Sequence, residues 1–308
     1  MKKALKWLII LIALANATFY GAQRFYPGLI LAVEPGVVYR SPYCSVRQAM
    51  AGVATKLEQE RTADAILAAS RIIKSENNLD LWQTPKGQYW IPTGRKEILS
   101  ILLAQQQRNI YGDQAWGVRK GDIVLDCGAH VGTYTRKALA AGASLVVAIE
   151  PAPGAVECLR RNLASEVSQK KVIIYPKGVW DKEDTLTLFT DRNADAGDSF
   201  VMHENSSKSI ERIPVTTIDK LTIELNLPRV DFIKADVKGS TERAIRGGAM
   251  VIGKYHPRMA FSTEETADDP KTIAAVTRSL VPGYHMQCGP CLLDNKEVYT
   301  DVLFFRYE

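Results

Sequence analysis

The sequence is poor in cysteine and histidine, the side chains on which disulfide frameworks and most zinc sites depend. Its 308 residues include five cysteines at uneven spacing and four scattered histidines. An odd, unevenly spaced set of cysteines is not a disulfide framework, and a zinc site would need further ligands at partner spacing. Cys288 and Cys291 form a C-x-x-C pair, but it lacks the strand-to-helix setting of thioredoxin-like motifs. We therefore expect a pair of thiols in a loop, and no metal site.

Clusters of basic residues with interleaved aromatics are also missing, although the formal net charge is +5. This absence argues against a nucleic-acid partner. Repeats and low-complexity segments do not occur, and a hydrophobic content of 46% with 24% charged residues is typical of a folded protein. The length allows one large domain and a small additional module.

One long apolar segment is present, at the N-terminus. Lys2, Lys3 and Lys6 precede an apolar run from Trp7 to Ala22, and the apolar character continues to residue 33. We interpret residues 1–33 as a signal anchor, a single-pass helix that contacts the cell membrane through residues 5–33. A cleaved signal peptide is the alternative. Because the lysines precede the anchor, the positive-inside rule places the rest of the chain on the non-cytoplasmic side.

Residues 34–118 have the pattern of a small module before the main domain. A linker is predicted to run into a helix at Ala63–Lys74, where apolar residues recur with helical spacing. A Pro/Gly turn predicts a hairpin over residues 81–92. A second amphipathic helix is predicted over Arg95–Ile110.

From residue 119 to 308 strands alternate with helices, which is typical of a doubly wound α/β domain with a parallel sheet. Helices are expected at Tyr134–Ala141 and Val156–Ala164, and two final strands, Tyr284–Cys288 and Asp301–Tyr307, predict a closing antiparallel hairpin. The parallel strands are predicted at Ile123–Asp126, Leu145–Glu150, Val172–Tyr175, Phe232–Asp236 and Met259–Thr263.

A glycine-rich turn joins the first of these strands to the following helix. The turn reads Asp126-Cys127-Gly128-Ala129-His130-Val131-Gly132, and the next strand ends in Glu150. Glycines allow a sharp turn and close approach of a ligand to the backbone, while an acid at the end of the second strand can accept hydrogen bonds from both ribose hydroxyls. The spacing differs from the G-x-G-x-x-G of dinucleotide sites. The pattern predicts an adenosine site at the switch point of the sheet.

These motifs resemble those of the FkbM-type methyltransferases over about residues 120–307. Beyond the glycine turn and Ile149-Glu150-Pro151, the resemblance rests on Lys177–Asp181, Ile213–Asp219, Val230–Val237, Arg246–Gly248 and Pro282–Tyr284. The resemblance implies a seven-stranded Rossmann-like methyltransferase sheet and S-adenosylmethionine as the methyl donor. It also implies methylation of a hydroxyl on a sugar or another small molecule. The cofactor-binding residues it implies are Asp126, Gly128, Gly132, Glu150, Val179 and Asp236, and we add His130 of the same glycine turn as a cofactor-binding candidate.

The sequence departs from the family pattern at three places near the expected site. His130 replaces the usual Asn, Lys238 replaces an acid after Asp236, and Glu264-Glu265 replaces a Tyr-His pair. Transfer of a methyl group to oxygen needs a base near the acceptor hydroxyl. We take Asp236, Lys238 and Glu264 as the catalytic candidates, with His130 as a further candidate base.

Two functions therefore remain open from the sequence. One is a membrane-anchored O-methyltransferase, supported by the glycine turn and Glu150. The other is a non-catalytic methyltransferase-fold subunit of a membrane protein complex, supported by the three departures and by topology. The positive-inside rule places the domain outside the cytoplasm, whereas the cofactor supply argues for the cytoplasmic side.

Overall fold

The computed structural model describes residues 36–39, 41–113, 115–191, 206–263, 269–294 and 296–308. The predicted membrane anchor, residues 1–33, lies outside the described residues, and so does the catalytic candidate Glu264. Within the described ranges, no helix combines the length and the apolar character needed to cross a bilayer.

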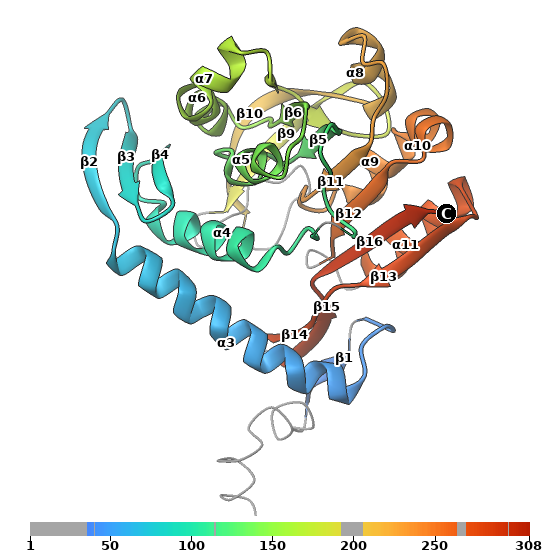
Figure 1. Cartoon of the computed structure of the whole chain (residues 1–308). Coiled ribbons are helices and arrows are strands. Elements are labelled where there is room, and N and C mark those ends of the chain that lie inside the picture. Colours follow the sequence, from blue (N-terminus) through green and yellow to red (C-terminus); the bar gives the residue numbers. More distant parts are fainter. Residues whose placement is uncertain (1–35, 40, 114, 192–205, 264–268, 295) are drawn as a thin grey trace, which may run out of the picture.

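A seven-stranded sheet forms the centre of the molecule (Figure 1). Its order is β13 (Tyr284–Cys288), β16 (Val302–Tyr307), β12 (Arg258–Ser262), β11 (Phe232–Ala235), β5 (Ile123–Cys127), β6 (Leu145–Ile149) and β7 (Val172–Tyr175). The five strands from β12 to β7 are parallel. Each of them begins and ends within one residue of its predicted bounds, so the predicted parallel sheet is confirmed.

Hydrophobic clusters cover both faces of this sheet. Val124 and Val146 pack on one face with helices α5 (Thr133–Ala140) and α6 (Pro153–Asn162). Leu125 and Val147 pack on the other face with four further helices. These are α8 (Ile218–Glu224), α9 (Thr241–Arg246), α10 (Ala249–Tyr255) and α11 (Asp269–Leu280). A strand that is buried on both faces must be apolar along nearly its whole length, and this pattern explains why the strands could be predicted from the sequence.

The C-terminal strands differ from the predicted simple hairpin. β13 and β16 are antiparallel neighbours, as predicted. Two further strands, β14 (Cys291–Asp294) and β15 (Glu297–Thr300), lie between them in the chain and belong to a separate sheet with β1 (Val38–Tyr39). Another small sheet contains β8 (Gly178–Val179), β10 (Ser206–Thr216) and β9 (Asp184–Asp191). A five-residue helix, α7 (Ala164–Ser168), follows α6.

One prediction for the N-terminal module, the bounds of its first helix, is wrong. Helix α3 spans Val46–Ala68 and begins at a capping box of Ser45 and Gln48, whereas we predicted a helix over Ala63–Lys74. β2 (Arg71–Glu76) covers the last third of that range and pairs with β3 (Leu79–Thr84). No residue of β2 is fully buried, so its sequence carries no strand alternation, and pairing with β3 overrides the local helical spacing.

The other two N-terminal predictions are confirmed. β3 and β4 (Gly87–Pro92) form the predicted antiparallel hairpin. Helix α4 spans Lys96–Arg108, within the predicted range.

Helix α3 packs against β14 at the base of the molecule (Figure 1), and we refer to α3, β1, β14 and β15 together as the clasp. A disulfide joins Cys44, just before α3, to Cys291 in β14. The expected pair of loop thiols is therefore wrong: Cys291 is oxidised, and Cys288 is a free cysteine in β13. Gly52 permits the close packing, because a Cβ there would lie 1.6 Å from the Cys291 carbonyl oxygen.

Candidate functional site

A cavity of about 540 Å³ opens at the carboxyl ends of β5, β6 and β11. In this sheet the chain proceeds from β5 to β6 and β7 on one side and to β11 and β12 on the other, so the cavity lies at the switch point. Helices α3 and α4 and the clasp strands provide the opposite wall. Its size is in the range of small-molecule sites.

The glycine turn after β5 depends on Gly128. Its φ of 78° favours glycine, and a Cβ at this position would lie 2.1 Å from the Asp236 carbonyl oxygen. The turn is tied to the next strand, because the N–H groups of Gly128 and Ala129 both donate to the Ile149 carbonyl at 3.0 Å. The close approach to Asp236 and the hydrogen bonds to Ile149 thus fix the backbone that a ligand would approach.

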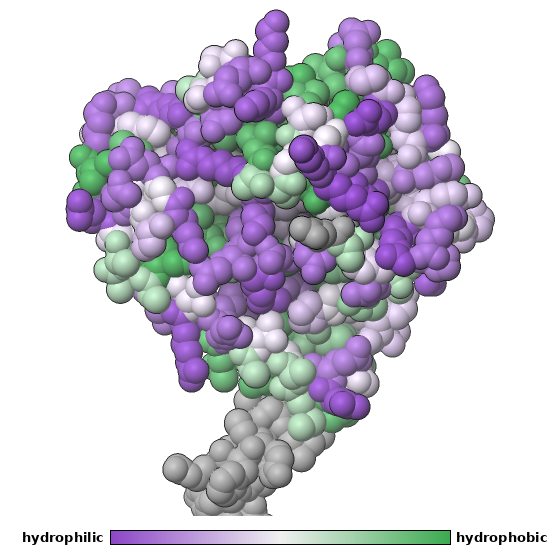
Figure 2. Space-filling model, viewed as in Figure 1, coloured by the Kyte–Doolittle hydropathy of each residue, from purple (hydrophilic) through white to green (hydrophobic). Residues whose placement is uncertain are grey.

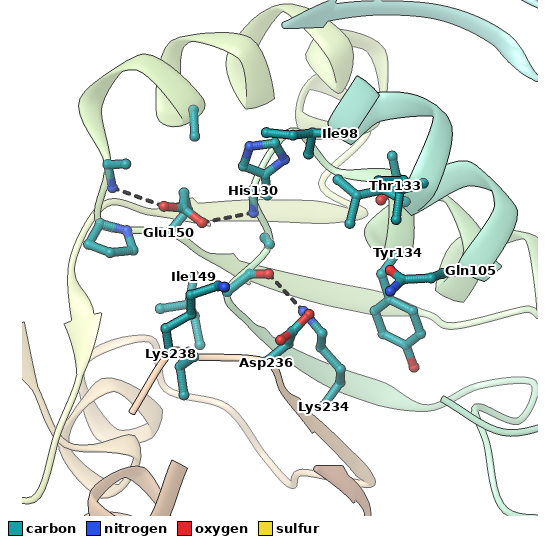
Figure 3. Close-up of a pocket in the computed structure, with 18 of the residues that line it drawn as sticks. Ile98, Gln105, His130, Thr133, Tyr134, Ile149, Glu150, Lys234, Asp236 and Lys238 are labelled. Carbon is teal, nitrogen blue, oxygen red and sulfur yellow. Dashed lines mark hydrogen bonds between the residues drawn. The ribbon is translucent and has the colours of Figure 1, made fainter. Parts of the chain in front are cut away.

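The Glu150 carboxylate lies at the end of β6 and is oriented by the backbone (Figure 3). The His130 N–H donates to Oε2 at 2.8 Å, and the Ala152 N–H donates to Oε1 at 3.0 Å. Glu150 is only 7% exposed, yet it lines the cavity. These two bonds fix the acid at the position predicted for ribose recognition.

His130 connects the glycine turn to the cavity. Its backbone has a positive φ of 49°, and its Nδ1 atom is buried without a hydrogen-bond partner among the described residues. Burial lowers the pKa of His130 to about 4, with Lys234 and Arg95 acting in the same direction. The imidazole is therefore neutral at neutral pH and presents an unsatisfied polar atom at the site.

Lys234, which lines the cavity, forms an ion pair with Asp126 of the neighbouring strand. They are direct partners in the register of β11 and β5, with Lys234 Nζ 3.2 Å from Asp126 Oδ1. Asp126 also accepts from the Thr135 hydroxyl at 2.7 Å, and Lys234 donates to the Gly128 carbonyl at 2.7 Å (Figure 3). Burial opposes the charge of Lys234, but Asp126 and Asp236 outweigh it and raise its pKa. Sequence reasoning did not single out Lys234, although a lysine within an apolar strand is itself a signal.

Tyr111 and Asp236 both line the cavity and contact each other. The Tyr111 hydroxyl donates to Asp236 Oδ2 at 2.6 Å. The ring of Tyr111 packs edge-on against Tyr134, and Lys234 Nζ lies 5.2 Å from the Tyr111 ring centroid. Sequence reasoning missed Tyr111, which follows α4 and carries no motif.

The structure brings most of the predicted residues to the cavity and leaves two away from it. The lining residues among those predicted are Gly128, His130, Glu150, Val179, Asp236 and Lys238. Asp126 and Gly132 do not line the cavity. Asp126 is held in the sheet by Lys234, and Gly132 begins α5 in a position where a Cβ would lie 3.1 Å from Leu159 and Leu163. Across the described ranges, no group of three or more potential metal ligands occurs.

Comparisons with solved structures give distant similarities. The FkbM methyltransferase of Methylobacillus flagellatus is 13% identical, with 84% of this chain and 62% of that chain covered and a TM-score of 0.48. SMU.1697c of Streptococcus mutans, solved with SAH, is 12% identical, with coverages of 62% and 91% and a TM-score of 0.40. The tRNA m1G37 methyltransferase of M. jannaschii is 12% identical, with coverages of 77% and 57% and a TM-score of 0.41. Curated protein sequences give no significant match.

The sequence profile of the methyltransferase FkbM domain matches residues 126–280, half of the chain. The match begins at Asp126 in the glycine turn and includes Glu150, Val179 and Asp236. It indicates S-adenosylmethionine as the cofactor. The chain belongs to the FkbM methyltransferase family.

Proposed function

We propose that this protein is an O-methyltransferase that transfers a methyl group from S-adenosylmethionine to a hydroxyl of a sugar or another small molecule. The observation that carries the proposal is the Glu150 carboxylate, fixed by the His130 and Ala152 N–H groups beside the glycine turn. A carboxylate at this position can accept hydrogen bonds from the two ribose hydroxyls of the donor.

Three further features of the cavity fit this donor. Gly128 allows the glycine turn to pass close to the backbone of Asp236, since a Cβ there would meet the Asp236 carbonyl oxygen, and the donor end thus lies beside the candidate base. The buried Nδ1 of His130 has no hydrogen-bond partner among the described residues, and a polar ligand would satisfy it. The loop at Val179 closes the side of the cavity where the adenine would lie.

The chemistry divides between the donor and the residues of this chain. When bound, S-adenosylmethionine supplies an electrophilic methyl group on a sulfonium. Asp236 accepts the proton of the acceptor hydroxyl, and Tyr111 positions its carboxylate through the 2.6 Å hydrogen bond. Lys234 and Asp126 hold the strand ends that carry Asp236 and the glycine turn.

Titration calorimetry of the full chain with S-adenosylhomocysteine tests the proposal. We expect micromolar affinity, roughly −8 kcal/mol. Glu150→Gln should weaken it about tenfold or more, since ribose hydroxyls would lose a charged acceptor. Glu58→Gln, an exposed position on α3, should leave it unchanged. A folded chain that does not bind the compound would refute the proposal.

We further propose that residues 5–33 anchor the protein in the cell membrane, with the domain on the non-cytoplasmic side. The lysines before the apolar segment support this orientation. The Cys44–Cys291 disulfide supports it as well, because disulfides persist in oxidising compartments and are rare in the cytosol. Reporter fusions after Glu308 test the orientation, and an active cytoplasmic reporter would contradict it.

The same disulfide favours a second candidate, a non-catalytic subunit of a membrane protein complex. S-adenosylmethionine is made in the cytoplasm, so an enzyme in an oxidising compartment would need its donor carried across the membrane, whereas a non-catalytic subunit would need no donor. This candidate predicts a folded chain that does not bind S-adenosylhomocysteine and that co-purifies with membrane proteins. The calorimetric titration therefore decides between the two functions.

A further inference from the structure

One edge of the N-terminal hairpin is paired by side chains of the methyltransferase domain. Within the described residues, β4 is the last strand of the sheet it forms with β2 and β3, so its second edge has no strand partner. Arg136 Nη1 of α5 donates to the Gln88 carbonyl at 2.7 Å, and Asn162, the last residue of α6, bonds the backbone of Trp90. The outer strand β2 is exposed, and Figure 2 shows hydrophilic and hydrophobic residues intermixed over it. The hairpin therefore docks through its β4 edge, where the free backbone groups need partners.

The amide of Asn162 pairs with β4 as a neighbouring strand would. Its Oδ1 accepts from the Trp90 N–H at 2.7 Å, and its Nδ2 donates to the Trp90 carbonyl at 2.9 Å. The same nitrogen also donates to the Val131 carbonyl at 2.9 Å, so both of its hydrogens are used. The side chain is buried, and its bonds are shielded from water. One buried amide thus holds both β4 and the glycine turn.

The glycine turn contains a residue that needs support from its surroundings. His130 has a φ of 49°, an uncommon conformation for a residue other than glycine. Its N–H orients Glu150, and the carbonyl of the next residue, Val131, is held by Asn162. If the Val131 carbonyl loses this donor, the backbone of His130 can relax toward a more common conformation. The N–H that orients Glu150 would then move with it.

Both parts that Asn162 holds line the cavity, whereas Asn162 does not. In the methyltransferase domain the lining residues are His130 and Glu150. In the module, Pro92 at the end of β4 and Ile98 of α4 line the same cavity (Figure 3). Asn162 can therefore affect a bound molecule only through the residues that it holds.

We infer that Asn162 is a positioning residue of the donor site, which holds the glycine turn in the conformation in which the His130 N–H orients Glu150. The same amide holds the N-terminal module against that turn. The inference rests on the proposed function and adds to it a residue that does not touch the donor. A merely structural role would lower stability without any coupling to Glu150.

A double-mutant cycle tests this coupling. The full chain, Asn162→Leu, Glu150→Gln and the double variant are titrated with S-adenosylhomocysteine by calorimetry, under conditions in which urea denaturation shows each of them to be folded. Asn162→Leu removes all three hydrogen bonds, and we expect it to weaken binding about tenfold in the wild-type background. In the Glu150→Gln background we expect a loss of about threefold or less, because the carboxylate that the turn orients is already absent.

Two further variants complete the design. Asn162→Asp keeps the acceptor for the Trp90 N–H and removes both donors, so it serves in the same cycle if Asn162→Leu does not fold. Arg161→Gln is the matched control on the same helix. Arg161 lies 2.7 Å from Glu76 of β2 and 4.6 Å from the Trp90 ring centroid, and its printed contacts hold the hairpin without reaching the glycine turn. We expect Arg161→Gln to lower stability and to leave the affinity unchanged.

The outcomes separate the inference from the proposed function. A loss of affinity in the Asn162 variant that shrinks in the Glu150→Gln background supports the inference. Unchanged affinity in a folded Asn162 variant, or an equal loss in both backgrounds, would overturn it. An equal loss in Arg161→Gln would overturn it too, since looser docking of the hairpin would then be the cause. If the wild-type chain does not bind S-adenosylhomocysteine, the proposed function fails, and the inference fails with it before any variant is compared.

Discussion

Lys234 and Asp126 are register partners on neighbouring parallel strands, and Lys234 Nζ lies 3.2 Å from Asp126 Oδ1. Both residues are almost completely buried. The pair lies directly beneath the glycine turn, and the same lysine donates to the Gly128 carbonyl. The glycine turn and the strand that carries Asp236 are therefore joined by one buried ion pair.

Removal of one member of this ion pair should destabilise the folded chain. Lys234→Met would leave the Asp126 carboxylate buried without its counter-ion, and we expect a loss of about 3–5 kcal/mol in the free energy of unfolding. The double variant Lys234→Met/Asp126→Asn should recover part of that loss, because no unpaired charge remains. Urea denaturation measures both. Equal stability of wild type and Lys234→Met would contradict a structural role of the pair.

Gly128→Ala should damage the site through the backbone. The new Cβ would lie 2.1 Å from the Asp236 carbonyl oxygen at a positive φ, so the turn must shift. We expect stability to fall by about 1–3 kcal/mol and S-adenosylhomocysteine binding to be lost. Gly253→Ala is the matched control, since no atom lies within 4 Å of its added Cβ and alanine is favoured in a helix. Retention of binding by Gly128→Ala would show that the turn does not approach the ligand.

His130 should make stability depend on pH. Its pKa is about 4 in the folded chain, below the value of about 6.5 for an unfolded histidine. The unfolded state therefore takes up the proton first as pH falls. The contribution of His130 is fully present above pH 6.5 and is lost between about pH 6.5 and 4, amounting to roughly 2–3 kcal/mol. The free energy of unfolding is measured against pH for wild type and for His130→Asn, and the difference between the two curves is the contribution of His130. Parallel curves between pH 6.5 and 4 would contradict the burial of the imidazole.

The disulfide should stabilise the clasp. Cys44 and Cys291 are 247 residues apart in sequence, and closure of such a long loop typically contributes about 2–5 kcal/mol. We expect a loss of this size in Cys44→Ser and in reduced wild type. Titration of the denatured, unreduced chain should find three thiols, those of Cys127, Cys158 and Cys288. Detection of five thiols in protein isolated without reductant would mean that the bond does not form in the cell.

The parts of the fold that the sequence predicts are those with a strong local pattern. The parallel strands are apolar along their whole length because both faces are buried, and turns rich in glycine separate them from their helices. Glu150 could be located for the same reason, since it ends such a strand. Five further site predictions, from Gly128 to Lys238, also line the cavity.

The features that the sequence did not predict depend on contacts between distant segments. The clasp joins residues before position 70 to residues after 290, and no local pattern marks Cys44 as the partner of Cys291. Tyr111 reaches Asp236 only because α4 packs across the carboxyl ends of the strands. β2 was missed because its residues are exposed and its stability comes from its neighbour β3.

Hydrogen–deuterium exchange of the full chain with and without S-adenosylhomocysteine is the most direct test of the proposed donor site, because it reports where the compound binds. We expect slower exchange in peptides that contain residues 128–130 and 150–155, with no change in α10. Unchanged exchange at the glycine turn and at Glu150 under saturating compound would show that the donor does not bind there.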